Sequence, residues 1–143
     1  MSIIGWVIGL GAVYIAGSAV EKIDEIKSRN KFEKMSGYDF EQYCANYLKR
    51  CGYTNVDVTP KSGDFGADII ATTPGKLFSG ERKRICIQCK KYKKPVGVKA
   101  VQEVIGGMSY YHCSCGMVLS NAEFTKAAHE LAETSGVTLR TID

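Results

Sequence analysis

Two short apolar runs that carry polar side chains constrain the fold most. Residues 68–71 read Asp-Ile-Ile-Ala, and residues 85–92 read Ile-Cys-Ile-Gln-Cys-Lys-Lys-Tyr. Alternate residues of a strand point to the same face, so Gln88 and Lys90 project together. An acid that opens an apolar strand, such as Asp68, is costly unless it has a partner or a metal. If the two runs pair as neighbouring strands, Asp68, Gln88 and Lys90 converge at one point of a sheet.

This combination of side chains suits the hydrolysis of a phosphodiester. The reaction needs an activated water, in-line geometry and relief of negative charge, which divalent metals can supply. Mg2+ prefers hard oxygens from one or two carboxylates and keeps several waters. We therefore expect Asp68 and the amide oxygen of Gln88 to hold Mg2+, or Mn2+ in its place, and Lys90 to stabilise developing charge. The alternative is that all three are polar residues of a solvated strand edge.

Three further polar residues are candidates for the same site. Glu41 lies at the border of the apolar stripe of a predicted helix, from which it could reach the metal as a further ligand or simply be solvated. Asp64 lies in the glycine-rich turn before the first run, where it could assist the metal or hold the turn. Gln102 shares a helix face with Val98 and Ile105, which indicates a supporting contact with the site.

Hydrophobic periodicity and turn residues predict one α/β domain with a mixed sheet. Apolar side chains from Phe40 to Leu48 recur at helical spacing, and Ser36 and Asp39 have capping-box spacing before them. Alternation and Gly or Pro punctuation mark the strands. We expect the order α-β-β-β-α-β-α-β, with helices at 38–50, 97–111 and from Phe124 to just before Gly136, and strands at 55–59, 68–73, 84–92, 116–119 and 137–142.

The N-terminal segment predicts a membrane anchor. Residues 2–20 carry no charged side chain, and about 20 apolar residues form a helix that crosses a bilayer. Basic residues follow, so the positive-inside rule puts the C-terminal side in the cytoplasm. We expect a transmembrane helix at 1–20, a polar linker at 21–35 and a cytoplasmic domain at 36–143, anchored in the inner (cytoplasmic) membrane. The alternative is a glycine-rich apolar helix packed on the domain or another subunit of a soluble cytoplasmic protein.

The net charge and the cysteine content are compatible with a cytoplasmic protein that binds a polyanion. The net charge is +4, a mild bias that is compatible with DNA. The basic residues cluster around the second apolar run, and we expect four of them to contact DNA: Arg84, Lys91, Lys93 and Lys94. Cys86 and Cys89 have metal-ligand spacing, but residues three apart in a strand point to opposite faces. Reduced cysteines in a cytosolic domain are therefore the simpler interpretation of the six present.

Five motifs follow one another between residues 36 and 143: Phe40-Glu41, Thr59-Pro60-x-Ser62-Gly63-Asp64-x-Gly66-x-Asp68-Ile69-Ile70-Ala71, Gln88-Cys89-Lys90-Lys91-Tyr92, Val101-Gln102-Glu103-Val104-x-Gly106 and Leu119-Ser120-Asn121-Ala122-Glu123-Phe124-Thr125-x-x-Ala128. Together they resemble the catalytic domain of the Mrr family, a branch of the PD-(D/E)xK restriction-endonuclease-like superfamily.

The resemblance implies a restriction-endonuclease-like α/β/α core around a mixed sheet. It also implies that Asp68, Gln88 and Lys90 carry the chemistry, with Glu41 as an additional acidic site residue and Gln102 in support. The expected activity is Mg2+-dependent DNA endonuclease cleavage in a type IV restriction or defence role. The alternatives are a structure-specific repair or recombination nuclease and an inactive nucleic-acid-binding module. A homodimer is plausible, because one site cuts one strand.

Overall fold

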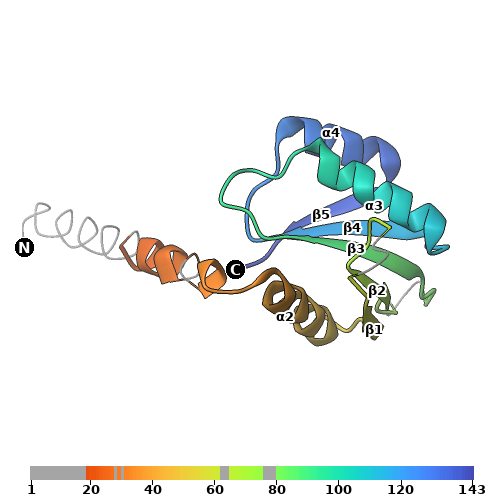
Figure 1. Cartoon of the computed structure of the whole chain (residues 1–143), viewed down its shortest axis with the longest axis horizontal. Helices are drawn as coiled ribbons and strands as arrows, with labels where there is room; N and C mark the ends of the chain where they lie inside the picture. Colours follow the sequence, from red (N-terminus) through yellow and green to blue (C-terminus); the bar gives the residue numbers. More distant parts are fainter. Residues whose placement is uncertain (1–18, 28, 30, 62–64, 76–79) are drawn as a thin grey trace, which may run out of the picture. The chain divides into compact units, whose positions relative to one another are not determined.

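The computed structural model describes residues 19–27, 29, 31–61, 65–75 and 80–143 (Figure 1). The contacts divide the chain into a unit that runs to Lys34 and a larger unit, Met35–Ile142. In the first unit, residues 19–27 are helical and expose Val20, Ile23 and Ile26. The predicted transmembrane segment at 1–20 lies outside the described residues, apart from its last two. No helix within the described residues has both the length and the apolar character needed to cross a membrane.

The larger unit is built on one mixed sheet with the strand order β1-β2-β3-β4-β5. Strands β1 (Thr54–Val58), β2 (Ile69–Thr72) and β3 (Arg84–Lys90) pair antiparallel, and β4 (Cys115–Ser120) and β5 (Val137–Thr141) then pair in parallel with β3. The α/β class and the mixed sheet predicted from the sequence are therefore confirmed.

Three helices cover the two faces of this sheet. Helix α3 (Val98–Tyr110) joins β3 to β4, and helix α4 (Lys126–Ser135) joins β4 to β5. Crossovers between parallel strands are almost always right-handed, and both helices accordingly pack on one face, while α2 (Gly37–Arg50) packs on β1 and β3 from the other (Figure 1). The predicted boundaries of all eight elements agree with these within two residues.

The predicted strand at 84–92 ends two residues early, at Lys90. The cause is Asn121, whose side chain binds the backbone of Tyr92 in both directions. The Tyr92 N–H donates to Asn121 Oδ1 at 2.8 Å, and Asn121 Nδ2 donates to the Tyr92 carbonyl at 3.0 Å. These bonds replace the sheet hydrogen bonds of Tyr92.

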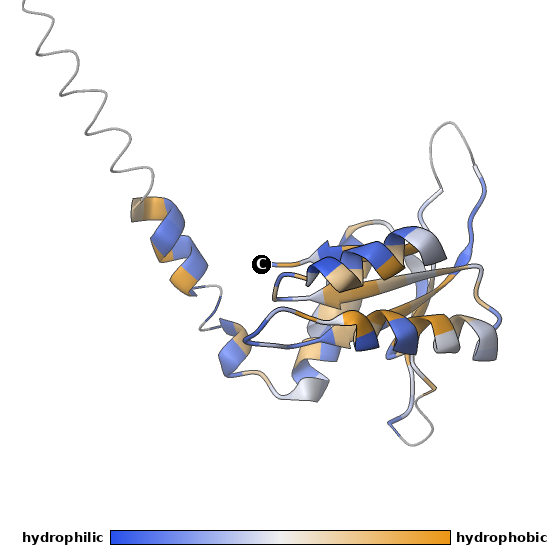
Figure 2. Cartoon of the chain, turned by 90° about the horizontal axis from the view of Figure 1, so that it is seen from above, coloured by the Kyte–Doolittle hydropathy of each residue, from blue (hydrophilic) through white to orange (hydrophobic). Residues whose placement is uncertain are grey.

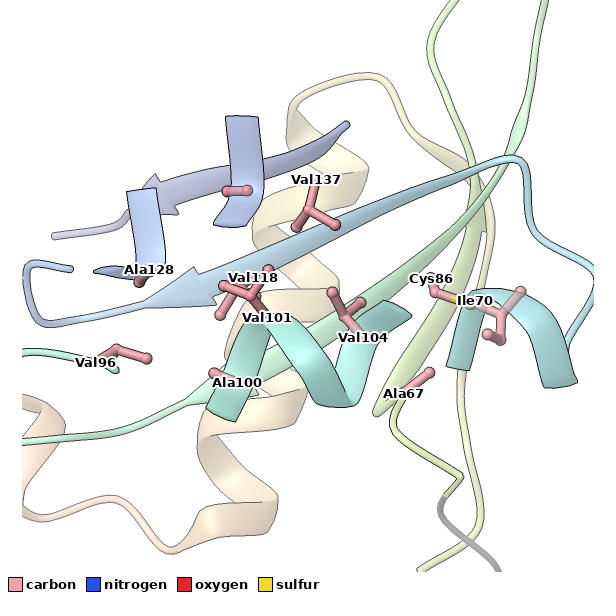
Figure 3. Packing of buried hydrophobic residues seen from close by; sticks show 11 residues of the cluster. Ala67, Ile70, Cys86, Val96, Ala100, Val101, Val104, Val118, Ala128 and Val137 are labelled. Carbon is pink, nitrogen blue, oxygen red and sulfur yellow. The ribbon is translucent and has the colours of Figure 1, made fainter. Parts of the chain in front are cut away.

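The central strands are apolar because both of their faces are covered. Residues Ile85–Gln88 of β3 and Gly116–Ser120 of β4 are buried without interruption, as expected for strands between two helical layers. Figure 2 shows hydrophobic strands at the centre and helices in which hydrophobic and hydrophilic residues alternate. On the α3 side, the core contains Cys86, Val101, Val104, Val118 and Val137 (Figure 3).

The loop before β2 lies directly against the backbone of α3. Gly66 has φ +89°, and a Cβ atom built there would lie 2.0 Å from the carbonyl oxygen of Glu103. On the helix, a Cβ atom at Gly107 would lie 2.8 Å from the carbonyl oxygen of Gly66. Two glycines thus permit a backbone-to-backbone contact that no other residue allows, and this contact fixes α3 relative to the start of β2.

Replacing Gly66 by alanine is expected to lower the free energy of unfolding by at least ~2 kcal/mol, because both the positive φ and the clash with Glu103 oppose the new Cβ. Urea denaturation followed by circular dichroism measures the loss. Gly106→Ala is the matched control in α3, since no neighbouring atom lies within 4 Å of a Cβ there, and it should gain roughly 0.5–1 kcal/mol. Equal stability of the two variants would contradict the contact.

Candidate active site

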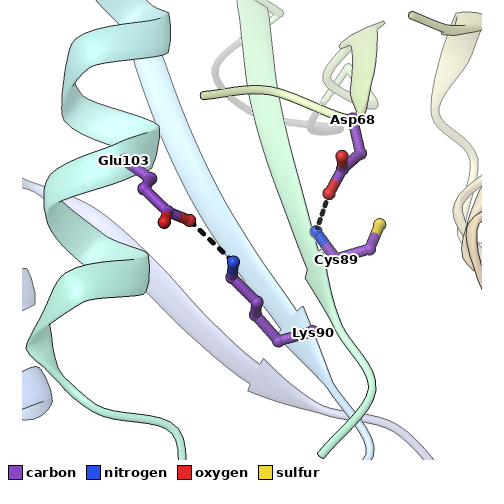
Figure 4. A network of polar contacts seen from close by, with 4 residues as sticks. All are labelled: Asp68, Cys89, Lys90 and Glu103. Atoms are coloured by element: carbon purple, nitrogen blue, oxygen red, sulfur yellow. Dashed lines mark hydrogen bonds and ion pairs between the residues drawn. The ribbon is translucent and has the colours of Figure 1, made fainter. Parts of the chain in front are cut away.

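The β2–β3 register brings Asp68 and Gln88 side by side. Ile69 pairs with Ile87, and the Asp68 N–H donates to the Ile87 carbonyl at 2.9 Å, so the pairing continues beyond the end of β2. Lys90 follows Gln88 by two residues and projects to the same face of β3, toward α3 (Figure 4). The pairing of the two runs as neighbouring strands, from which the sequence analysis expects Asp68, Gln88 and Lys90 to converge, is present in the structure.

Asp68 is held rigidly at this junction. Its side chain is buried, with 8% of the residue exposed, and Oδ2 accepts a hydrogen bond from the Cys89 N–H at 2.7 Å (Figure 4). The Asp68 carbonyl accepts from the Thr59 N–H at 2.8 Å. Bonds from two strands therefore fix both the backbone and the carboxylate, which gives a metal ligand a defined direction.

Gln88 places an amide oxygen beside this carboxylate. The residue is 6% exposed, and its Oε1 atom is buried and has no hydrogen-bond partner in the described part of the protein. Leaving a buried acceptor unsatisfied costs about 1–3 kcal/mol. Such an atom therefore needs an explanation, for example a ligand that binds it. A bound cation would satisfy it.

The donor set fits Mg2+ with a small number of protein ligands. Asp68 and Gln88 offer hard oxygens, and Mg2+ is usually held by one or two carboxylates with water completing its shell. The described residues contain no group of three or more His, Cys, Asp and Glu side chains arranged to hold a metal. Asp68 and Gln88 alone would give a Mg2+ ion one carboxylate and one amide, which is a weaker set than two carboxylates.

Lys90 forms an ion pair with a residue that the sequence analysis did not assign to the site. Its Nζ lies 2.7 Å from Glu103 Oε2, and the two side chains are only 17% and 30% exposed (Figure 4). Burial disfavours the ammonium, but the hydrogen bond and charge of Glu103, helped by Tyr92 and Asp68, outweigh it. The pKa of Lys90 is therefore raised above the ordinary 10.5, and its ammonium stays charged at neutral pH.

Glu103, and not Gln102, is the residue through which α3 contacts the site. Gln102 is exposed, whereas Glu103 is half-buried. The sequence contains the signal for this: Glu103 lies three residues after Ala100 and four before Gly107, and both of these are buried. An acid on the buried stripe of a helix needs a partner, and Lys90 is that partner.

Glu41 approaches from the other face of β3. It is half-buried on α2, next to the layer that holds the Cys89 thiol. The hydrogen bond with Cys44 and burial raise the pKa of Cys89 well above its ordinary value, and the charges of Asp68 and Glu41 raise it further. Both carboxylates are therefore close enough to this thiol to act on its charge. Asp64, the other predicted acid, lies outside the described residues.

The four predicted DNA-contacting cations separate into two groups. Lys91 donates to the Met35 carbonyl, while Lys93 and Lys94 are exposed in the segment after β3. Arg84 is exposed at the opposite end of β3, about 20 Å from Lys90 at a rise of ~3.3 Å per residue. The structure therefore does not bring Arg84 to the site that contains Lys90.

A mixed sheet between two helical layers, with a carboxylate, an amide and an ammonium where β2 meets β3, defines a restriction-endonuclease-like domain. The chain belongs to the Mrr family, because the family model of its catalytic domain, described as a restriction endonuclease, matches residues 32–143. The resemblance seen in the motifs is thereby confirmed. No curated protein gives a significant match.

Solved structures share this fold at low sequence identity. The DNA modification-dependent restriction endonuclease AspBHI has a TM-score of 0.62 and 23% identity, over 85% of this chain and 33% of its own. MspJI restriction endonuclease, solved with a 27-mer oligonucleotide, has a TM-score of 0.53 and 16% identity, over 80% and 28%. A repair endonuclease from Pyrococcus abyssi has a TM-score of 0.51 and 14% identity, over 76% and 48%. The chain thus spans about a third of AspBHI and about half of the repair endonuclease.

Replacing Glu103 by glutamine is expected to lower the pKa of Lys90. The substitution removes the negative charge that offsets the effect of burial on the ammonium. Unfolding free energy should also fall by about 1 kcal/mol, a value reduced for the partial exposure of the pair. A raised lysine pKa stabilises the fold below the unfolded-state pKa, and this contribution is lost as the pH rises through the folded-state pKa. The wild-type advantage should therefore be complete at neutral pH and shrink above about pH 10.5. NMR titration of the Lys90 side chain and urea denaturation test both statements, and an unchanged pKa would contradict them.

Proposed function

We propose that this domain is a Mg2+-dependent DNA endonuclease that hydrolyses phosphodiester bonds. The observation that carries the proposal is the unsatisfied, buried Oε1 atom of Gln88 beside the fixed carboxylate of Asp68, with the Lys90 ammonium two residues further along the strand. Membership of a restriction endonuclease family supports the same reaction class. Mn2+ is expected to substitute for Mg2+, because both prefer oxygen ligands.

Each residue then has a distinct task. Asp68 and Gln88 would hold the metal, and Glu41 would add a carboxylate from α2. When bound, Mg2+ would act as a Lewis acid and lower the pKa of a bound water. Lys90 is charged at neutral pH, so it would stabilise negative charge on the phosphate and would not accept a proton. Glu103 would position the Lys90 ammonium by the ion pair at 2.7 Å.

For the biological role we propose type IV restriction or a similar form of defence, with a structure-specific repair or recombination nuclease as the second candidate. The second candidate is favoured by an exposed pair of aromatic rings on α3 and the neighbouring loop.

Cleavage of both strands would require two copies of the site, and we propose a homodimer for that case. Analytical ultracentrifugation with and without DNA tests it, and a strict monomer that cuts both strands would refute it.

We further propose that residues 2–20 anchor the domain at the cytoplasmic face of the inner membrane. The proposal rests on the uncharged sequence of this segment and on the basic residues that follow it. Fractionation of cells that express the full-length chain tests it. Recovery of the protein in the soluble fraction without detergent would favour the packed-helix alternative.

Lys90→Ala is expected to abolish plasmid cleavage in Mg2+ while the fold is retained, because the ammonium acts on the phosphate and lies near the protein surface. Wild-type cleavage should disappear in EDTA and return with Mg2+ or Mn2+. Lys126→Ala is the matched control, since this lysine on α4 is 91% exposed and far from β3 in sequence. Normal cutting by Lys90→Ala would refute the assignment, and metal-independent binding without cutting would indicate a binding module.

Gln88→Leu should separate stability from activity. The leucine removes a buried acceptor that has no hydrogen-bond partner among the residues that the structure describes. The free energy of unfolding is therefore expected to rise by about 1 kcal/mol, whereas cleavage should be lost with the oxygen ligand. Urea denaturation and the plasmid assay measure the two effects on the same sample. A variant that is both destabilised and fully active would show that Gln88 has a structural role only.

A further inference from the structure

Two aromatic rings stack on each other at the surface close to the candidate active site. The centroids of Phe65 and Tyr110 are 3.9 Å apart with 19° between the ring planes, and Tyr111 packs edge-on against Tyr110 at 4.9 Å. Despite this contact, Phe65 and Tyr110 remain 51% and 53% exposed. We call Phe65 and Tyr110 the aromatic pair. Its exposed ring surface is available for a further planar group to stack on.

One basic residue contacts the backbone next to this pair. Arg84 Nε donates to the carbonyl of Tyr111 at 3.1 Å, which brings the start of β3 to the end of α3. Arg82 and Lys83 precede Arg84, and all three are exposed. Arg84 thus lies next to the aromatic rings, and Arg82 and Lys83 continue the basic run toward Gly75 and Thr73. A basic run that leads to exposed aromatic rings attracts a polyanion that carries aromatic groups, and a nucleic acid strand is such a polymer.

A cavity of about 380 Å3 adjoins the same residues. Arg84 and Tyr111 line it together with the polar side chains of Asn55, Asp57 and Thr72. Asn55 Nδ2 already donates to Thr72 Oγ1 at 3.3 Å, but the amide oxygen of Asn55 and the remaining guanidinium N–H groups of Arg84 are of the kind that recognise the edge of a nucleobase. The surroundings of the aromatic pair therefore favour a nucleotide over a hydrophobic protein segment.

Helix α3 joins this surface to the candidate active site. Glu103, the partner of Lys90, and Tyr110 are both on α3, separated by about 10 Å along its axis at ~1.5 Å per residue. The contact of Gly66 with the backbone of Glu103 lies between them. With ~3.4 Å per stacked nucleotide, this length corresponds to about three nucleotides of a strand that follows the helix.

We propose that the aromatic pair stacks on an unpaired nucleobase of the substrate, about three nucleotides from the phosphate at Lys90, while Arg82, Lys83 and Arg84 neutralise the neighbouring phosphates. The faces of bases inside a duplex are covered by their neighbours, so a protein ring can stack only on a base that has left the stack. The inference rests on the proposed nuclease function and specifies its substrate as DNA with unpaired nucleotides, such as a bulge, gap or branch.

The test is binding by the full-length chain in EDTA, so that no cleavage occurs. Fluorescence anisotropy compares a labelled DNA duplex with the same duplex carrying a bulge of unpaired thymines. Wild type should bind the bulged DNA more tightly. Tyr110→Leu should weaken that binding by about 5- to 100-fold and leave duplex binding within about twofold, because contacts to phosphates alone govern the duplex.

Three variants control the measurement. Tyr110→Phe keeps the ring and should bind like wild type, whereas Phe65→Leu removes the other ring and should reproduce the selective loss. Tyr38→Leu removes an aromatic residue of similar exposure, 52%, from α2 on the opposite face, and should change neither affinity. Circular dichroism confirms that each variant is folded.

Several outcomes would overturn the proposal. Equal losses on both DNAs, no loss in either leucine variant, or wild-type binding without preference for the bulge would each exclude a stacking platform. None of these affects the nuclease assignment, which depends on metal-dependent plasmid cleavage and its loss in Lys90→Ala. Failure of the wild type to bind either DNA in EDTA would also overturn the stacking proposal, while the nuclease proposal would still be decided by plasmid cleavage in Mg2+.

Discussion

The antiparallel register between β2 and β3 is the constraint on which the candidate site depends. Successive residues of a strand face opposite sides, so a slip of one residue would move Gln88 and Lys90 from the α3 side to the α2 side. The ends of the two strands are held against such a slip. Asp68 donates through its N–H to Ile87 and accepts through its carboxylate from Cys89. On its other side, Thr59 Oγ1 donates to the Ala67 carbonyl at 2.7 Å and joins the start of β2 to the end of β1. Asp68, a candidate metal ligand, thus also helps to set the register between β2 and β3.

The same face of β3 changes from core to site over three alternate residues. Cys86 belongs to the apolar cluster beneath α3, Gln88 is buried with an unsatisfied oxygen, and Lys90 is partly exposed in its ion pair. Polarity therefore rises as the strand approaches the edge of the helical layer. A purely structural strand would gain stability from an apolar residue at position 88, because an unpaired buried acceptor has a free-energy cost. Retaining glutamine there makes sense where the oxygen has a ligand.

The sequence was sufficient for the sheet and for the shared strand face of Gln88 and Lys90, because both depend on local periodicity. Alternation along 85–90 predicts that Gln88 and Lys90 share a face and that Cys86 and Cys89 do not. The structure agrees, since Cys86 joins the α3-side core and Cys89 interacts with Cys44 of α2.

Glu103 was missed because its role depends on how far α3 is rotated over the sheet. Periodicity gives the buried stripe of a helix, but the side chain opposite a given position is decided by packing, here by the contact between Gly66 and Gly107. Sequence distance alone also does not give the separation of Arg84 from Lys90, because an extended strand places two residues six positions apart at about 20 Å.

The close approach of two backbones at Gly66 and Gly107 also explains why chemistry and substrate selection would be linked in this domain. The contact fixes the α3 segment that carries Glu103, and on the other side it fixes the loop that carries Phe65 toward Tyr110. Both the orientation of the Lys90 ammonium and the geometry of the aromatic pair therefore depend on one backbone contact. A strand bound along α3 would meet the ring surface and the charged site at a fixed separation, because a helix does not stretch. The length of α3 would thus set the distance between a stacked base and the phosphate to be cut.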